Sequence, residues 1–239
     1  MHFIDTHIHL QDFETEIMQL MRQLKQSGTD KCICVSATEQ DWEKVAVLAQ
    51  KFPQSVIPAF AVHPWYAGNS QPDWKKHLEQ MIKDFPSALI GECGFDGIKG
   101  PEQSLQEEVF DFHIALADKY RRPLLLHIVK AQNQLSNYRN KIKQPFVFHS
   151  FNGSAEFLKQ VLKYNGYVAF NAKILQNKKA ETIIKAVPEN RLLFETDAPY
   201  QSNIGDLTLL CEKIAAIRGS GVEETANNVY YNSLRIINL

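Results

Sequence analysis

Short runs of β-branched, aliphatic and aromatic residues alternate with helical patterns from one end of this chain to the other. The eight strand-like runs lie at residues 2–8, 31–37, 56–63, 87–93, 123–129, 145–150, 166–172 and 191–199. Their continuous apolar character is typical of parallel strands that helices cover. Eight such units in 239 residues predict a single-domain TIM-type (β/α)8 barrel over residues 1–239. A distorted or seven-stranded barrel and an open, doubly wound parallel sheet remain alternatives.

The segments between these runs carry apolar residues at helical spacing. Residues 14–28 end in Gly28, a common helix stop, and residues 104–122 stop just before a proline. Two more helices are expected after the last strand, at 207–219 and 222–239. We expect these two C-terminal helices to pack on the barrel.

The composition is that of an ordinary globular protein, with 44% hydrophobic and 22% charged residues. A net charge of −1 argues against a positively charged surface that binds nucleic acid non-specifically, but it allows a nucleic-acid substrate at one local site. No apolar run approaches the roughly 20 residues of a membrane span, and the N-terminus does not resemble a signal peptide. The four cysteines do not resemble a disulfide framework, since Cys32 and Cys34 lie in an apolar strand. These features predict a cytoplasmic protein with no membrane contact and no evident obligate protein partner.

Ionisable side chains mark the ends of most of the expected strands. In the first run Asp5, His7 and His9 alternate, so all three point to one face of a strand. The later strand ends supply the other candidates, which are His63, Glu92, His127, His149 and Asp197. Each of them alone can be read as a satisfied polar group or a turn residue. Together they meet at the carboxyl ends of the strands, where a barrel gathers its chemistry.

Joint burial of so many ionisable groups predicts a metal centre, because without cations their burial would be costly. The six candidate ligands are His7, His9, Glu92, His127, His149 and Asp197. Six ligands exceed what one catalytic ion takes while keeping a position open for water, so we expect two divalent ions bridged by Glu92. Mixed nitrogen and oxygen ligands favour Zn²⁺ or Mn²⁺ and suit Mg²⁺ less well, and the spacing leaves the identity open.

The charge of such a centre bears on its substrate. Two divalent ions outweigh two carboxylates and a bridging hydroxide, which favours an anion such as a phosphoryl group. Two metal ions also stabilise both the attacking and the leaving oxygen of a phosphoester. A neutral amide remains an alternative, because the same ions would polarise its carbonyl group.

Six motifs taken together resemble the TatD family of metal-dependent hydrolases, described as TatD-like deoxyribonucleases. In chain order they read FIDTHIHL, AVHPWY, IGECGFD, LLLHIV, VFHSFNGS and LFETDAPY. The resemblance implies an amidohydrolase-like barrel that hydrolyses phosphoesters, commonly in DNA, as an exonuclease-type enzyme. It implies one ion held by His7, His9, Glu92 and Asp197, and another held by Glu92, His127 and His149. The segments GFDGIKG and DAPYQSN depart from the family pattern, on loops that would frame the substrate.

Our mechanistic hypothesis is that a hydroxide bridging the two ions attacks phosphorus, while Asp197 orients it or accepts its proton. Glu92 and His63 complete the catalytic candidates. His63 would contact phosphate or donate to the leaving group, with a structural role beside Pro64 as the alternative. Asp5 is expected either behind the metal ligands, hydrogen-bonded to a ligand histidine or to a neighbouring loop, or as a structural cap.

Further side chains near the expected barrel mouth are candidates for substrate contact. Lys130 and Lys173 follow the fifth and seventh strands and would touch phosphates or stay solvated. The helix start just past His149 offers free N–H groups to a phosphate. Base stacking and simple packing are both open for the aromatic residues Trp65, Tyr66 and Phe95.

Two other functions stay open at this point. A related barrel hydrolase would act on a small phosphoester, lactone or amide and leave nucleic acid uncut. A metal-binding partner subunit would hold metal and hydrolyse none of these, although the complete ligand set disfavours it. The remaining histidines receive no functional role, and these are His2, His77 and His113.

Overall fold

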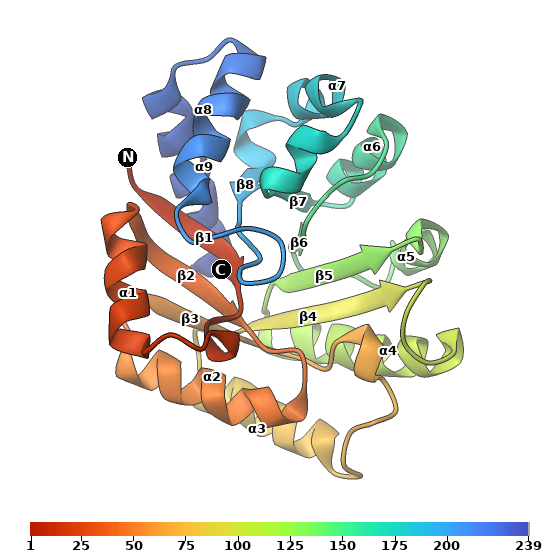
Figure 1. Cartoon of the computed structure of the whole chain (residues 1–239). Coiled ribbons are helices and arrows are strands. Elements are labelled where there is room, and N and C mark those ends of the chain that lie inside the picture. Colours follow the sequence, from red (N-terminus) through yellow and green to blue (C-terminus); the bar gives the residue numbers. More distant parts are fainter. Residues whose placement is uncertain (239) are drawn as a thin grey trace.

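Eight parallel strands form one sheet in the order β1 to β8 in the computed structural model, which describes residues 1–238 (Figure 1). They are β1 Phe3–Ile8, β2 Thr29–Val35, β3 Val56–Phe60, β4 Leu89–Asp96, β5 Leu124–Val129, β6 Phe146–Phe148, β7 Gly166–Phe170 and β8 Leu192–Phe194. A parallel bridge between Ile8 and Ala198 joins the end of β1 to the segment after β8. The sheet thus closes on itself, and the predicted (β/α)8 barrel is confirmed.

Helices separate the strands and surround the sheet (Figure 1). The α-helices are α1 Ile17–Gln26, α2 Glu39–Lys51, α3 Trp74–Asp84, α4 Gln103–Tyr120, α5 Gln132–Tyr138, α6 Ala155–Lys163, α7 Ala180–Ala186, α8 Asp206–Arg218 and α9 Val222–Ile237. Short 3-10 helices are η1 Leu10–Asp12, η2 Pro64–Tyr66, η3 Ala172–Gln176 and η4 Glu189–Arg191. The expected helices are present, with bounds that differ from the expected ones by at most three residues. Leu239, the last residue expected in the final helix, lies outside the described residues.

Local side-chain contacts explain where helices begin. The Glu16 carboxylate accepts hydrogen bonds from the N–H groups of Met18 and Gln19, so α1 starts after it rather than at residue 14. At α6, the Ser154 hydroxyl accepts from the N–H of Phe157. Each cap satisfies donors that a helix N-terminus leaves without partners.

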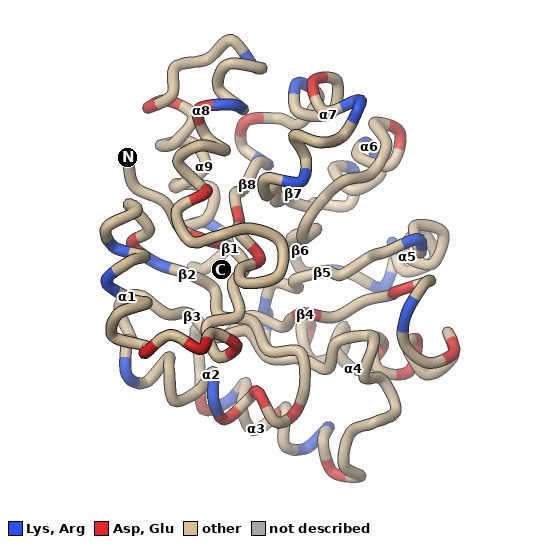
Figure 2. Tube along the Cα trace, viewed as in Figure 1, with Lys and Arg blue, Asp and Glu red and all other residues tan. Residues whose placement is uncertain are grey.

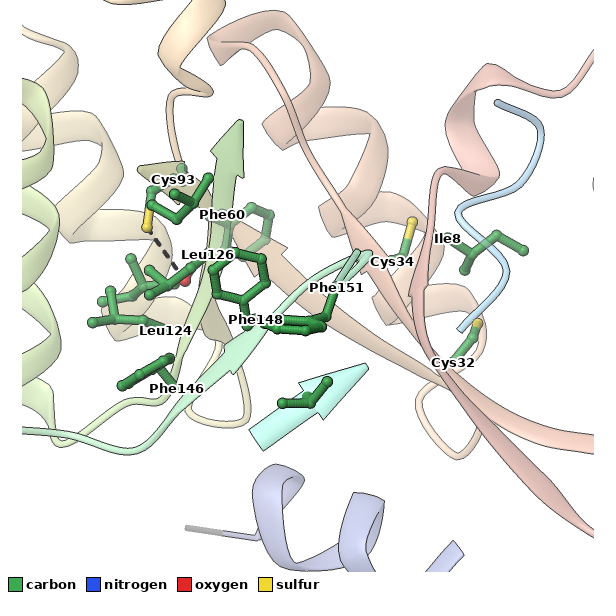
Figure 3. Packing of buried hydrophobic residues seen from close by; sticks show 14 of the residues in the cluster. Ile8, Cys32, Cys34, Phe60, Cys93, Leu124, Leu126, Phe146, Phe148 and Phe151 are labelled. Atoms are coloured by element: carbon green, nitrogen blue, oxygen red, sulfur yellow. Dashed lines mark hydrogen bonds between the residues drawn. The ribbon is translucent and has the colours of Figure 1, made fainter. Parts of the chain in front are cut away.

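Two hydrophobic layers hold the barrel together. The inner layer fills the barrel with side chains from the strands, namely Ile33, Val35, Ala59, Leu89, Leu125, Val147, Tyr167, Ala169 and Leu193. The outer layer packs the other face of the strands against the helices, and Figure 3 shows Phe60, Leu126 and Phe148 within it. Since each strand is buried on both faces, its sequence reads as a continuous apolar run.

The last helix closes the end of the barrel where the strands begin. Ile236 of α9 is fully buried and belongs to the inner layer. Asn232 of the same helix donates hydrogen bonds from Nδ2 to the carbonyls of Glu189 and Leu192, just before and at the start of β8. Only the opposite end of the barrel is therefore free for a site.

Charged residues lie mainly on the outer helices and loops (Figure 2). All four cysteines are buried and free of disulfides, as expected for small apolar residues. Within residues 1–238, no helix combines the length and the apolar character that a membrane crossing needs.

Candidate metal centre

The structure gathers the expected ligands at the carboxyl end of the barrel. His7 lies in β1, and His149 and Asp197 lie in the loops after β6 and β8. Glu92 and His127 lie inside β4 and β5 rather than at their ends, because these two strands keep pairing beyond them. All of these side chains are buried except that of His127, which is partly buried.

One cluster joins His7, His9 and Asp197. The two Nε2 atoms of His7 and His9 lie 3.2 Å apart, and Oδ1 of Asp197 lies 3.4 Å from Nε2 of His9. Backbone hydrogen bonds create this proximity, since the N–H of Asp197 donates to the His7 carbonyl and the N–H of His9 donates to the Ala198 carbonyl. Two ring nitrogens and a carboxylate oxygen thus converge on one volume, which is a donor set suited to a divalent ion.

Glu92 lies between this cluster and a second one. Its Oε2 is 3.3 Å from Nε2 of His7, while its Oε1 is 2.6 Å from Nδ1 of His127 and 3.5 Å from Nε2 of His149. Nε2 of His149 also lies 3.5 Å from Oδ2 of Asp197. The two oxygens of one carboxylate therefore face two groups of histidines, the arrangement that a bridging ligand requires.

The outer nitrogens of two histidines contact carboxylates. Nε2 of His127 lies 3.1 Å from Oδ2 of Asp96, and Nδ1 of His149 lies 2.9 Å from Oε1 of Glu195. A carboxylate on the outer nitrogen fixes the proton there and turns the lone pair of the inner nitrogen into the site. Both rings are thereby oriented as metal ligands, so the residues present fit a metal centre.

His63 differs from these two rings, because its protonated nitrogen is the one that faces the site. Its Nδ1 accepts a hydrogen bond of 3.1 Å from the N–H of Trp65, so the neutral ring carries its proton on Nε2. That Nε2 lies 3.5 Å from Oε1 of Glu92, and His63 forms a potential cation-binding group with Glu92 and His127. A protonated Nε2 is a hydrogen-bond donor and not a ligand, so the geometry favours a donor role for His63.

Asp5 lies beneath the ligands. Its Oδ1 accepts from the N–H of His7 at 3.1 Å and from the N–H of Thr196 at 3.0 Å, and its Oδ2 accepts from the Thr196 hydroxyl at 2.6 Å. These bonds tie β1 to the segment after β8. Asp5 thus bonds both to the backbone of a candidate ligand histidine and to the neighbouring loop, as the first of the two expectations describes, and the same bonds give it a structural role.

The charges within the cluster shift the pKa values of its side chains. Burial disfavours a charge on His149, but the carboxylates of Glu195, Glu92 and Asp197 outweigh it and raise the pKa of His149 to about 10. For Glu92, burial favours the protonated form, yet the surrounding histidines hold the pKa of Glu92 well below its usual value. A metal ion must therefore displace a proton from His149 in order to bind there.

Two acidic residues of this site were missing from the sequence prediction. Asp96 and Glu195 are buried behind His127 and His149, yet the chain shows them only as the last letter of IGECGFD and the Glu of ETDAPY. The available signal was spacing, because Glu195 precedes Asp197 by two positions and follows a buried strand. Which histidine each carboxylate supports depends on contacts across strands, which spacing does not reveal.

The candidates for substrate contact have mixed outcomes. Phe95 is 1% exposed and packs against Phe110, so the stacking interpretation of Phe95 is wrong, since β4 turns this side chain into the outer core. Trp65 and Tyr66 are 36% and 37% exposed, and their rings lie beside that of His63. Lys130 is exposed and remains a candidate.

The other basic and backbone candidates have less support. Lys173 is exposed, and its N–H donates to the Asn171 side chain. At the start of α6, the Ser154 cap already takes one of the free N–H groups. Neither feature belongs to the cluster of histidines and carboxylates.

Several known proteins are similar to this chain over nearly its whole length. Residues 4–238 match the family model described as TatD related DNase. An uncharacterised metal-dependent hydrolase of Bacillus subtilis, YabD, is 24% identical, with 98% of each chain covered. A 3'-5' ssDNA/RNA exonuclease of Dickeya dadantii, TatD, is also 24% identical, over 94% of this chain and 92% of that protein.

Solved structures share the same fold. The TatD homologue YjjV of Escherichia coli superposes with a TM-score of 0.88 at 23% identity, covering 99% of this chain and 98% of that one. A TatD-family hydrolase of Entamoeba histolytica superposes with a TM-score of 0.90 at 19% identity, covering 98% of this chain and 97% of that one.

Proposed function

Because this chain belongs to the TatD-related DNase family, we propose that it is a metal-dependent nuclease that hydrolyses phosphodiester bonds in DNA from a strand end. The observation that carries the proposal is the orientation of His127 and His149, whose inner nitrogens face Glu92 while carboxylates hold the outer ones. This arrangement suits catalysis with metal ions. A small phosphoester, lactone or amide is the alternative substrate class.

The proposal includes two divalent ions. One would be held by His7, His9, Glu92 and Asp197, and the other by Glu92, His127 and His149. Mixed nitrogen and oxygen ligands suit Zn²⁺ or Mn²⁺, and Mg²⁺ is the third candidate. When bound, such ions lower the pKa of water and neutralise the charge of a phosphoryl group.

The side chains of this chain have separate roles in the proposed reaction. Asp197 lies within reach of both histidine clusters and accepts the proton of the attacking water. His63 directs its Nε2 proton into the site and donates it to the leaving oxygen. Asp96 and Glu195 hold the ligand rings in position.

The test uses a 5′-labelled single-stranded DNA oligonucleotide, metal-stripped protein and separate additions of Mg²⁺, Mn²⁺ and Zn²⁺. We expect a ladder of shortened products that appears only with metal. The control is Glu92→Gln, whose fold is checked by circular dichroism and which should give no ladder. An oligonucleotide that stays intact with every ion would overturn the nuclease proposal and direct the search to small esters and amides.

A further inference from the structure

A pocket of about 350 Å³ lies beside the candidate metal centre. It is lined by the end of β4, the loop before α4, the segment just after β5 and the first turns of α4 and α5. Its polar lining includes Asp96, Lys99, Gln103, Lys130 and Gln134. None of the six candidate metal ligands lines this pocket. The lining loop carries the segment GFDGIKG, which departs from the pattern that the sequence resembles.

The loop that forms one wall is fixed by its backbone. Oδ1 of Asp96 accepts from the N–H of Ile98 at 2.7 Å and from the N–H of Lys99 at 2.9 Å. The N–H of Gly97 donates to the Val129 carbonyl, and a side chain at this glycine would lie 2.8 Å from the carbonyl oxygen of Lys130. The loop therefore lies flat against β5, and the pocket exists before any ligand arrives.

The pocket is positively charged. Lys99 and Lys130 supply two ammonium groups, and within residues 1–238 neither forms an ion pair or a side-chain hydrogen bond. Asp96 is the only acidic residue of the lining. Its carboxylate is already bonded to two backbone N–H groups, to Trp65 and to His127. Figure 2 shows basic positions beside the ends of β4 and β5.

One of these ammonium groups is held in place over an aromatic ring. Nζ of Lys99 lies 4.3 Å from the centre of the Trp65 ring, within the range of a cation–π contact. Nε1 of Trp65 donates to Oδ2 of Asp96 at 2.6 Å, and the same oxygen contacts His127. A chain of three contacts thus leads from the positive pocket to a candidate metal ligand, so the pocket adjoins the reacting centre.

We propose that this pocket binds a backbone phosphate of the substrate strand next to the phosphate that is hydrolysed, through Lys99 and Lys130. The inference rests on the proposed nuclease function and names the part of the substrate that the pocket recognises. Phosphate contacts position a strand without reading its sequence. The pocket should increase the affinity for substrates with several phosphates, whereas it should not affect the affinity for an isolated phosphodiester.

The test compares two substrates in the wild-type protein, Lys99→Ala, Lys130→Ala and the double variant. One substrate is the single-stranded oligonucleotide, and the other is bis(4-nitrophenyl) phosphate, a phosphodiester without neighbouring phosphates. For the oligonucleotide we expect KM to rise about tenfold in the double variant, with kcat little changed. The slope of log kcat/KM against log salt concentration should become shallower by about one unit for each lysine removed. The kinetic constants for the small diester should stay at the wild-type values.

The matched control is Lys213→Ala, an exposed lysine of α8 outside the pocket lining, which should leave both substrates unaffected. If the wild-type protein cleaves the oligonucleotide and the double variant has an unchanged KM for it, the phosphate pocket is overturned while the nuclease proposal stands. An equal loss on both substrates also overturns it, because the lysines would then act on the metal centre. A wild-type protein that leaves the oligonucleotide intact overturns the proposed function and, with it, this inference.

Discussion

Asp96 lies directly behind His127, with its Oδ2 3.1 Å from the Nε2 atom of the histidine. The same Asp96 oxygen accepts from the indole of Trp65. One buried carboxylate therefore links the rim of the barrel to the candidate metal centre, and the position of the His127 ring depends on it.

Replacing Asp96 by Asn should weaken metal binding. The amide removes the negative charge that holds the proton on the outer nitrogen of His127, so we expect about 10- to 100-fold lower affinity for the second ion. Isothermal titration of the metal-stripped variant measures this affinity. Asp111→Asn, which changes an exposed carboxylate paired with Lys141, serves as the control and should bind metal like the wild type. Equal affinity in both variants would show that Asp96 does not support the ligand.

Because of the tautomer of His63, we expect a variant of this residue to lose activity but to keep its bound metal. His63→Asn keeps an acceptor for the Trp65 N–H and removes the ring donor that points at Glu92. If His63 donates to the leaving group, kcat falls about 10²- to 10⁴-fold while the bound metal stays the same. Metal analysis after dialysis decides the matter, since a variant that loses an ion would identify His63 as a ligand instead.

His113 should make the fold sensitive to acid. Its Nε2 accepts from the N–H of Val62, and burial lowers the pKa of His113 to about 3. In the unfolded chain this histidine takes up a proton below about pH 6.5, whereas in the folded protein it does so only near pH 3. The free energy of unfolding therefore falls by up to about 1.4 kcal/mol for each pH unit of acidification within this window.

Urea denaturation at pH 7.5 and pH 5, both with chelator, tests this effect. His113→Gln keeps an acceptor near Val62 and does not titrate. Between pH 7.5 and pH 5 its free energy of unfolding should therefore fall by about 2 kcal/mol less than that of the wild type. Identical losses would show that His113 does not contribute to the acid sensitivity.

The carboxylate of Asp5 should stabilise the closure of the barrel. Asp5→Asn retains one acceptor oxygen for three donors, from His7 and Thr196, and should lower the free energy of unfolding by about 1.5–3 kcal/mol. Asp84→Asn alters an exposed carboxylate on α3 and should stay within about 0.5 kcal/mol of the wild type. Urea denaturation of the three proteins compares them, and a stable Asp5 variant would argue against the proposed role of these bonds.

Element boundaries show what the residues alone reveal about this fold. The apolar runs located all eight strands, because burial on both faces leaves a local mark in the sequence. The runs did not reveal that β4 continues to Asp96, because this extension depends on pairing with β5. For the same reason, the residues alone leave base stacking and packing both open for Phe95, which lies in the outer core.

The chain by itself determined the barrel and the set of polar residues at its carboxyl end, since periodicity and strand endings are local properties of a sequence. Only the tertiary structure decided what each residue faces. Asp96 stands behind His127, Glu195 stands behind His149, and the N–H of Trp65 sets the proton of His63. These contacts join residues from different strands and loops, and a ring nitrogen acts as ligand or donor according to the partner on its other side.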